Sequence, residues 1–240
     1  MSLAVILAGG YGKRLRPLTE TTPKPLLRVA GKPIIVHQIE WLREYGYSEF
    51  VVTVGWLKEK LISELGSGSR YGVTIVYAVE EEPLGTGGAI HNIKDILSKR
   101  EEFLVLNGDV LTNLNPQKLY DPLREGYAAS IAAVELKSTY GVIDIDDSGR
   151  VRSFREKPVI PEYWINAGVY AMTPRALKYM PEKGDVERTA LPQMASDGVL
   201  AAVKYSLRNI YWRSIDSHKD LEEASKEIEM MGGLIRGLKE

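Results

Sequence analysis

A glycine-rich segment near the start of the chain carries a marked excess of positive charge. Residues 9–32 contain six cations and one acid, in a chain whose formal net charge is -1. Glycine lets the backbone approach a phosphate chain closely, so that N–H groups can point at anionic oxygens. The Arg14 guanidinium can bind two such oxygens at once, and the Lys24 ammonium can add a point charge. The segment therefore predicts a triphosphate-binding site.

Two other nucleotide-binding patterns fit this segment less well. A redox dinucleotide fold needs a third glycine where this chain has Leu15, and an acid after its second strand, where the chain has Val54. The Gly-Lys-Ser/Thr of a Walker A loop does not occur in the sequence. We therefore favour the triphosphate interpretation, with Lys13, Arg28 and Lys32 as solvated surface charges.

Two aspartates are candidates for binding a divalent cation beside that triphosphate. Asp109 follows the apolar run 103–106, and Asp216 follows the run 210–215. A triphosphate reaction needs Mg²⁺, which proteins hold with one or two carboxylates plus phosphate oxygens. We expect both carboxylates at this metal. The alternatives are a turn-forming role for Asp109 and, for Asp216, a place in the approach to a helix capped by Ser217.

The elements that must position these residues alternate between strand and helix. Apolar runs predict buried strands at residues 3–7, 50–54, 73–79 and 103–106. Apolar side chains at helical spacing predict helices within residues 33–46, 57–65 and 86–97. This alternation predicts a Rossmann-like, doubly wound α/β sheet. The glycine segment and Asp109 then lie at the carboxyl edge of that sheet, where ligands bind.

The second half of the chain is less regular and richer in strands. Strands are predicted at residues 129–136, 142–145, 151–154 and 167–172, and a turn at 146–149 joins two of them into a hairpin. Thr173 and Pro174 indicate the start of a helix, and residues 217–220 indicate the capping box of a final helix. No linker rich in proline, glycine or serine divides the chain. The sequence therefore predicts one domain with a mixed sheet and an inserted β-rich half.

Composition limits the classes of protein that fit. The chain has 240 residues, of which 44% are hydrophobic and 26% charged, enough for one substantial core. A pI near 6.4 argues against a general binder of nucleic acid or anionic membranes. The amino-terminal apolar run, residues 3–8, is too short for a signal peptide or membrane span. Cysteine is absent, which excludes disulfides and thiolate catalysis and favours a cytoplasmic protein. Three separated histidines argue against a histidine-based metal site.

Eight motifs together resemble those of the sugar-1-phosphate nucleotidyltransferases, the nucleoside-diphosphate-sugar pyrophosphorylases. They lie at residues 7–19, 23–25, 82–88, 107–109, 140–141, 156–158, 166–168 and 216. They occur in the family's order over nearly the whole chain. The resemblance implies an enzyme that transfers a nucleotidyl group from an NTP to a sugar 1-phosphate, releasing pyrophosphate and forming an NDP-sugar.

The resemblance also implies roles for individual residues. The triphosphate is expected at Gly9, Gly10, Gly12 and Arg14. Lys24 is expected near the reacting phosphate, so that Arg14, Lys24 and Asp109 are the expected catalytic residues. Glu80 and Gly85 are expected at the base, and Asp109 and Asp216 at Mg²⁺. The sugar 1-phosphate is expected at Gly141, Glu156, Lys157 and Asn166, which makes the β-rich half a sugar-binding half.

Plainer interpretations exist for part of the sugar set. Glu156 and Lys157 also fit an exposed ion pair, Asn166 a turn residue, and Tyr140 simple packing. For the implied reaction no covalent intermediate is needed. No general base is evident in the sequence either, because a phosphate nucleophile is already deprotonated at neutral pH. Alignment and charge neutralisation, with Mg²⁺ as cofactor, would then supply the catalysis.

The nucleobase and the sugar are less well determined. The acidic run 80–82 favours GTP, because a carboxylate can accept both guanine donors, N1–H and N2–H; the alternative is that these acids face water. The motifs at 82–88 and 164–168 most resemble mannose-1-phosphate guanylyltransferases, which implies GTP and mannose 1-phosphate. The alternatives are UTP or dTTP with glucose 1-phosphate, a short transferase acting on heptose or N-acetylmuramate 1-phosphate, and a catalytically silent regulatory homologue that binds a nucleotide sugar.

The resemblance implies a simple organisation. We expect residues 1–240 to form a single nucleotidyltransferase catalytic domain, without the carboxyl-terminal left-handed β-helix of typical guanylyltransferases of this group. The expected partners are the NTP and the sugar 1-phosphate, with no nucleic acid and no membrane. A homo-oligomer stays open, because the apolar side chains of residues 222–239 could pack on the core, which we favour, or on a second subunit.

Overall fold

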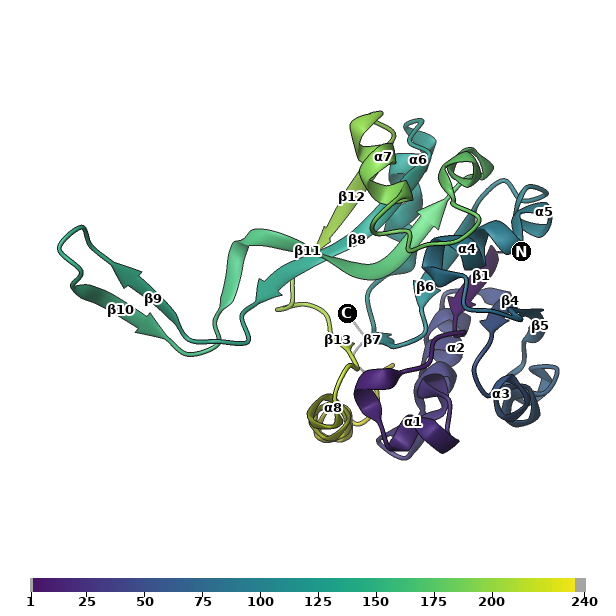
Figure 1. The fold of residues 1–240 in the computed structure, drawn as a ribbon, viewed down its shortest axis with the longest axis horizontal. Helices are drawn as coiled ribbons and strands as arrows, with labels where there is room; N and C mark the ends of the chain where they lie inside the picture. Colours follow the sequence, from purple (N-terminus) through teal and green to yellow (C-terminus); the bar gives the residue numbers. More distant parts are fainter. Residues whose placement is uncertain (1, 236–240) are drawn as a thin grey trace.

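Seven strands form one mixed sheet through the body of the molecule (Figure 1). The computed structural model describes residues 2–235. In spatial order the strands are β12 (Leu200–Tyr205), β8 (Ala129–Lys137), β11 (Val159–Met172), β6 (Phe103–Asn107), β1 (Ser2–Leu7), β4 (Tyr47–Val54) and β5 (Thr74–Val79). The strands β6, β1, β4 and β5 are parallel, and β12 is parallel to β8, whereas β11 runs antiparallel to both β6 and β8. The predicted doubly wound α/β fold is confirmed.

Helices cover both faces of this sheet. One face packs against α2 (Ile34–Glu44) and α3 (Lys58–Leu65). The other packs against α4 (Gly85–Asn92), α5 (Lys94–Leu97) and α7 (Ala190–Ser196). Side chains alternate across each strand, so Ala4 and Ile6 enter the first core while Leu3 and Val5 enter the second. Both faces of β1, β4 and β6 are largely buried, so these parallel strands are apolar runs rather than alternating ones.

Short elements fill the glycine-rich segment and the remaining connections. The segment itself contains η1 (Lys13–Leu15), α1 (Leu18–Thr21), η2 (Lys24–Leu26), β2 (Arg28–Val29) and β3 (Lys32–Pro33). The later elements are η3 (Ser69–Tyr71), β7 (Val110–Thr112), η4 (Pro116–Tyr120), α6 (Asp121–Arg124), η5 (Pro174–Tyr179), β13 (Trp212–Ser214) and α8 (His218–Met230). Two predictions need correction: the helix expected at 86–97 is divided at Ile93, and the helix expected after Thr173 is a 3-10 helix.

The β-rich half forms an arm that projects from the body (Figure 1). Its end is the antiparallel hairpin of β9 (Val142–Ile145) and β10 (Val151–Arg155). The arm leaves the sheet along β8 and β11, and β11 is longer than the predicted strand at 167–172. Between residues 2 and 235 no helix combines the length and the apolar character that crossing a membrane requires.

A third, smaller core fixes the last helix beside the amino-terminal segment. Ala224 and Ile228 of α8 are buried with Leu15, Leu111 and Ile215. The helix also lies next to β2. The predicted packing of this stretch on the core is thus found for Ile228 and Leu234, whereas Met230 and Met231 are exposed. Residues 236–240 lie outside the described part of the chain.

Candidate functional site

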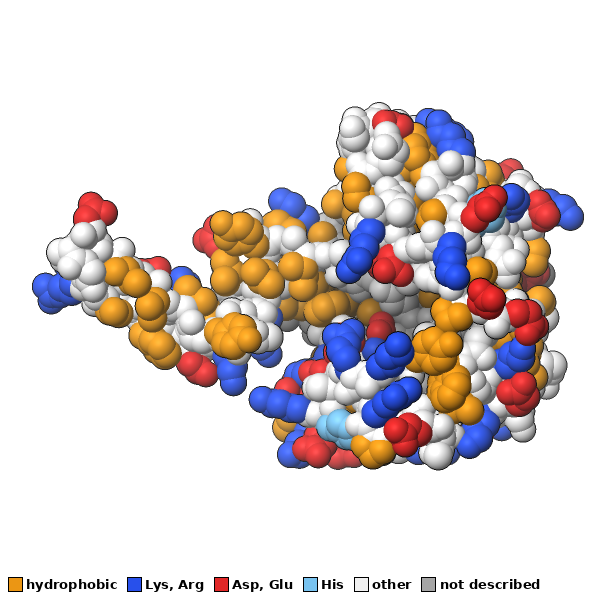
Figure 2. Space-filling view, in the orientation of Figure 1, with side chains coloured by type: hydrophobic (Ala, Val, Ile, Leu, Met, Phe, Trp, Pro, Cys, Tyr) orange, Lys and Arg blue, Asp and Glu red, His pale blue; other side chains and the backbone are white. Residues whose placement is uncertain are grey.

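A cleft of about 380 Å³ opens at the carboxyl ends of β1, β4 and β6. This is the edge at which open α/β sheets bind ligands. Figure 2 shows a hollow in this view of the molecule, with Lys and Arg side chains along its rim. The predicted site residues that line the cleft are Gly9, Gly10, Gly12, Arg14, Lys24, Glu80, Gly85, Asp109 and Asp216.

Two glycines of the first loop differ in what the fold demands of them. Gly12 has φ 61°, and a Cβ there would lie 2.9 Å from the Thr19 side chain and 3.1 Å from Lys24 Cβ. A larger residue at position 12 would strain the backbone and collide with Thr19 and Lys24. Glycine avoids both, so the loop can pack closely against Lys24. A Cβ on Gly10 would meet no described atom within 4 Å. The bare backbone at Gly10 is therefore not a packing requirement, and it faces space that a ligand can fill.

A short antiparallel pairing brings the two distant aspartates together. β7 follows Asp109 directly, and β13 ends two residues before Asp216. The strands pair with Ser214 opposite Val110, and the Ile215 N–H donates to the Asp109 carbonyl over 2.9 Å. Ile215 is fully buried in the third core, so the end of β13 is fixed beside Asp109. The carboxylates of two residues more than a hundred positions apart thus meet at one place in the cleft.

Lys24 bridges these carboxylates, and Arg14 binds one of them. Lys24 Nζ lies 2.6 Å from Asp109 Oδ2 and 3.2 Å from Asp216 Oδ1. Arg14 Nη2 lies 2.8 Å from the same Asp216 oxygen. The Lys24 side chain is 14% exposed and the Arg14 side chain 75% exposed. Lys24 is therefore held inside the cluster, whereas most of the Arg14 side chain remains open to an incoming anion.

The environment of Asp216 favours its charged form. Burial by itself raises the pKa of this carboxyl. The Lys24 charge, the hydrogen bond from Ser214 and the Arg14 charge outweigh burial, so that the pKa lies below its usual value. Asp216 is accordingly a carboxylate at neutral pH, which is the form that binds a metal.

Glu80 occupies a more enclosed part of the cleft. Its Oε2 accepts a hydrogen bond from the Leu84 N–H over 3.3 Å. A Cβ on Gly9 would lie 2.8 Å from its Oε1, so the carboxylate lies against the glycine loop. Burial raises the pKa of Glu80, and the hydrogen bonds from Leu84 and Thr53 offset this only in part. The group is a hydrogen-bond acceptor whose charge is less firmly held than that of Asp216.

Four predicted sugar-site residues lie apart from this cluster, and none is among the described residues that line the cleft. Gly141 and Glu156 meet at the base of the hairpin, where a Cβ on Gly141 would come within 3.1 Å of Glu156 Oε2. Lys157 lies beside Glu156, with 3.7 Å between charged atoms, and both are exposed. Asn166 lies on β11 and donates to the Tyr170 hydroxyl over 2.7 Å. The structure thus gathers the first three on the arm and leaves Asn166 at its root.

Four polar residues that line the cleft had been assigned no role from the sequence: Thr53, Thr86, Asn107 and Asp185. Thr53 is the next-to-last residue of β4, and Asn107 is the last residue of β6. A polar residue at the carboxyl end of a predicted strand is the sequence signal that points to both. Asp185 approaches from a distant loop: a Cβ on Gly85 would lie 2.9 Å from its Oδ1. The glycine at 85 indicates that something comes close, but its sequence context does not say what.

Comparison with protein families gives one clear result. A family model described as "Nucleotidyl transferase" matches residues 3–230. Similar curated proteins include the mannose-1-phosphate guanylyltransferase catalytic subunit beta of Drosophila pseudoobscura pseudoobscura, 38% identical over 224 residues. The mannose-1-phosphate guanyltransferase of Debaryomyces hansenii is 38% identical over 225 residues. These alignments cover 90% of this chain and 60% and 61% of the relatives.

Solved structures show the same architecture. HddC from Yersinia pseudotuberculosis superposes with a TM-score of 0.74 at 29% identity, over 95% of this chain and 99% of that one. The same protein complexed with GMP-PN gives 0.73 at 28% identity, with the same coverage. A putative glucose-1-phosphate thymidylyltransferase from Bacillus anthracis gives 0.75 at 23% identity, over 100% of this chain and 97% of that one, a likeness of fold.

Proposed function

The chain belongs to the nucleotidyl transferase family, and we propose that it transfers a nucleotidyl group from an NTP to a sugar 1-phosphate, releasing pyrophosphate. One observation carries the proposal: Arg14, Lys24, Asp109 and Asp216 converge at one point of a cleft bounded by a glycine loop. Two cations with two carboxylates suit a triphosphate that arrives with a divalent cation. The chain spans about 60% of the length of the curated relatives. Their activity and substrates are therefore attributed to this chain as a proposal.

The donor set fits Mg²⁺. Asp109 and Asp216 each present a carboxylate oxygen to the same ammonium group, so both face one point. Mg²⁺ is commonly held by one or two carboxylates, with the rest of its shell supplied by phosphate and water. When bound here, the ion would neutralise phosphate charge between the substrate and the two aspartates.

The chain's own residues divide the work of the proposed reaction. Backbone N–H groups of the Gly9–Gly10 loop bind the triphosphate, and Arg14 holds its oxygens from the open side of the cleft. A sugar phosphate oxygen forms a bond to the α-phosphorus while the bond to pyrophosphate breaks. Lys24 is placed to exchange an aspartate partner for a phosphate oxygen and to offset the charge that develops there. No proton needs to leave the nucleophile.

We propose guanine as the base. Glu80 lines the enclosed part of the cleft and presents acceptor oxygens beside the glycine loop, which suits the adjacent N–H donors of guanine. The curated relatives cited above are named as guanylyltransferases, and HddC was solved with GMP-PN. These names support GTP as the nucleotide.

For the second substrate we propose mannose 1-phosphate. The names of the curated relatives favour it. Gly141, Glu156 and Lys157 then contact the sugar 1-phosphate from the arm, and Asn166 contacts it from the root of β11. We also propose that residues 1–240 form one catalytic domain and that the enzyme acts in the cytoplasm.

Pyrophosphate release tests the proposal. The protein is incubated with Mg²⁺, each of GTP, UTP, dTTP, CTP and ATP in turn, and a panel of sugar 1-phosphates that includes mannose, glucose, heptose and N-acetylmuramate. We expect release with GTP and mannose 1-phosphate, and none from Asp109→Asn. Release with another pair of substrates would support the proposed reaction but contradict GTP and mannose 1-phosphate as its substrates. Binding of a nucleotide sugar without any release would instead indicate a silent homologue.

A further inference from the structure

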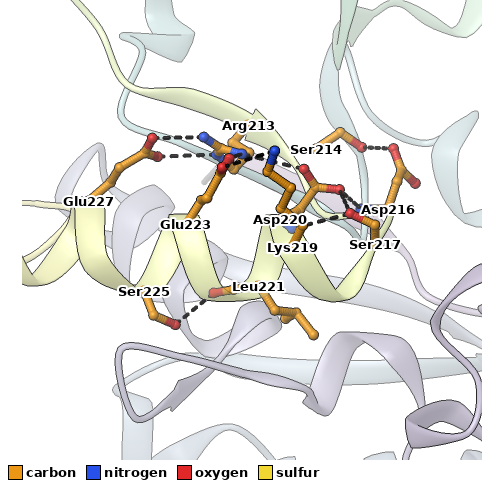
Figure 3. Close-up of polar contacts among 10 residues, drawn as sticks. All are labelled: Arg213, Ser214, Asp216, Ser217, Lys219, Asp220, Leu221, Glu223, Ser225 and Glu227. Atoms are coloured by element: carbon orange, nitrogen blue, oxygen red, sulfur yellow. Dashed lines mark hydrogen bonds and ion pairs between the residues drawn. The ribbon is translucent and has the colours of Figure 1, made fainter. Parts of the chain in front are cut away.

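Arg213 connects β13 to three carboxylates of α8 (Figure 3). Its Nε and Nη2 donate to the two oxygens of Glu227 over 3.1 and 2.7 Å. Its Nη1 donates to Glu223 over 3.0 Å and to Asp220 over 3.4 Å. The Arg213 side chain is 15% exposed, so the guanidinium is largely shielded from solvent, whereas the Glu223 side chain is 43% exposed. The three acids are spaced at i, i+3 and i+7, which places them on one side of the helix.

Asp220 differs from the other two acids because it also contacts Asp216 and Ser217, the two residues before α8. Its Oδ1 accepts from Arg213, while its Oδ2 accepts from the Asp216 N–H over 3.1 Å and from the Ser217 hydroxyl over 2.7 Å. Ser217 in turn accepts from the Asp220 N–H, which caps α8. The Asp220 carboxylate therefore fixes the backbone of Asp216, outside the helix that Asp220 belongs to.

The Asp216 side chain is fixed separately. The Ser214 hydroxyl donates to Asp216 Oδ2 over 2.8 Å, which leaves Oδ1 directed at Lys24 and Arg14. Backbone and carboxylate are thus held by different partners. Loss of the backbone hydrogen bond would let the peptide before the helix rotate, and the carboxylate would move with it.

We propose that Asp220, braced by Arg213, is a positioning residue that sets the Asp216 carboxylate for binding the metal–nucleotide complex. The inference rests on the proposed function, because it assumes that Asp216 is a ligand. The ion pair with Arg213 holds the Asp220 carboxylate toward β13 rather than toward solvent. Arg213 also offsets the mutual repulsion of the three acids that it contacts, which lie within about two turns of α8. Partners that orient a ligand commonly change metal affinity about 10- to 100-fold when they are removed.

Manganese affinity measured without turnover separates this role from simple helix capping. Mn²⁺ binding is followed by electron paramagnetic resonance in the presence of GTP and the absence of any sugar phosphate. The wild type is compared with Asp220→Ala, Asp220→Asn and Asp216→Asn. Glu223→Gln is the matched control, because it removes another acid partner of Arg213 on the same helix without touching Asp216. Thermal unfolding of every variant reports the purely structural effect.

We expect Asp220→Ala to weaken Mn²⁺ binding about 10-fold or more. Asp220→Asn, which keeps an acceptor for the Asp216 N–H, should weaken it less. Glu223→Gln should bind Mn²⁺ like the wild type even where its melting temperature falls. Wild-type affinity in both Asp220 variants, together with weakened binding in Asp216→Asn, would overturn the positioning role and leave the proposed function intact. Unchanged affinity in Asp216→Asn, or no binding of Mn²⁺ with GTP by the wild type, would remove the metal site and this inference with it.

Should Asp220→Ala fail to fold, Arg213→Lys gives a second test. A lysine keeps the positive charge but loses the fork that holds Glu227 and Asp220 together. We expect weaker Mn²⁺ binding in a folded Arg213→Lys protein, and wild-type binding there would contradict the brace.

Discussion

Lys24 holds the arrangement of charges in the cleft. Two carboxylates that approach one another repel, and the largely shielded Lys24 ammonium between Asp109 and Asp216 offsets that repulsion. Arg14 reaches the same carboxylate from a more exposed position. Because these pairs satisfy the aspartates in the free protein, a metal enters most favourably together with a triphosphate, whose oxygens provide new partners for both cations.

The Gly10→Ala substitution tests whether a ligand approaches the bare backbone of the loop. A methyl group there meets no described atom within 4 Å, so thermal stability should stay within about 1 kcal/mol of the wild type. The KM for GTP should rise, because the methyl group projects toward the triphosphate. Gly12→Ala is the control: its φ of 61° and its 2.9 Å contact predict a loss of stability instead. An unchanged KM in a stable Gly10→Ala protein would place the triphosphate elsewhere.

The pH dependence of GTP binding tests Glu80. Burial raises the pKa of this carboxyl, so Glu80 takes up its proton at a higher pH than an ordinary glutamate. The protonated acid has lost an acceptor for guanine, so the KM for GTP should rise as the pH falls through that raised pKa. Glu80→Gln should have a higher KM at neutral pH and lack this rise. If wild type and Glu80→Gln give parallel pH profiles, Glu80 does not bind the base.

Elements differ in how far the sequence predicts them. The strands β1, β4 and β6 and the helix α2 follow from apolar runs and helical spacing, because each buries its own side chains in a large core. The pairing of β7 with β13 cannot be predicted in this way. The two short strands are about a hundred residues apart, and the sequence of neither one indicates which strand it pairs with. The Arg213 contacts are not predictable from the sequence for the same reason. Three acids on one side of a helix are typical of a solvent-exposed face, and the sequence does not indicate that Arg213 of a separate strand contacts them.

The arm is the element whose function is most open to test. Lys157→Ala removes the positive charge expected at the sugar phosphate, a charge-assisted bond worth about 1.5–3 kcal/mol. We expect the KM for mannose 1-phosphate to rise roughly 10-fold or more, with the KM for GTP unchanged. Arg150→Ala, in the turn between β9 and β10, removes a cation from the same arm and should change neither value. Equal effects of the two variants would indicate a general charge effect of the arm.

The molecule as a whole separates a buried scaffold from an exposed arm. Phe103 is fully buried between the sheet and its helices, whereas Phe154 on the hairpin is 65% exposed. Together with Ile143, Ile145 and Val151, Phe154 gives the hairpin large exposed apolar side chains. Stability should therefore reside in the body, and the arm should be free to serve binding.

Paired substitutions measure this separation. Phe103→Ala should lower the free energy of unfolding by about 3–5 kcal/mol, because it leaves a cavity in the core. Phe154→Ser should change it by less than about 0.5 kcal/mol, as at other surface positions. Denaturant unfolding of both variants is the measurement. A large loss in Phe154→Ser would show that the arm is packed against something in solution, such as a second subunit.

A crystal structure with Mn²⁺ and a non-reacting GTP analogue tests the central claim most directly. The anomalous signal of manganese locates the ion without reference to the protein chain. We predict one peak bonded to oxygens of both Asp109 and Asp216, with the triphosphate over Gly10 and in contact with Arg14. A peak that touches neither aspartate, or a triphosphate bound outside the cleft, would contradict the account.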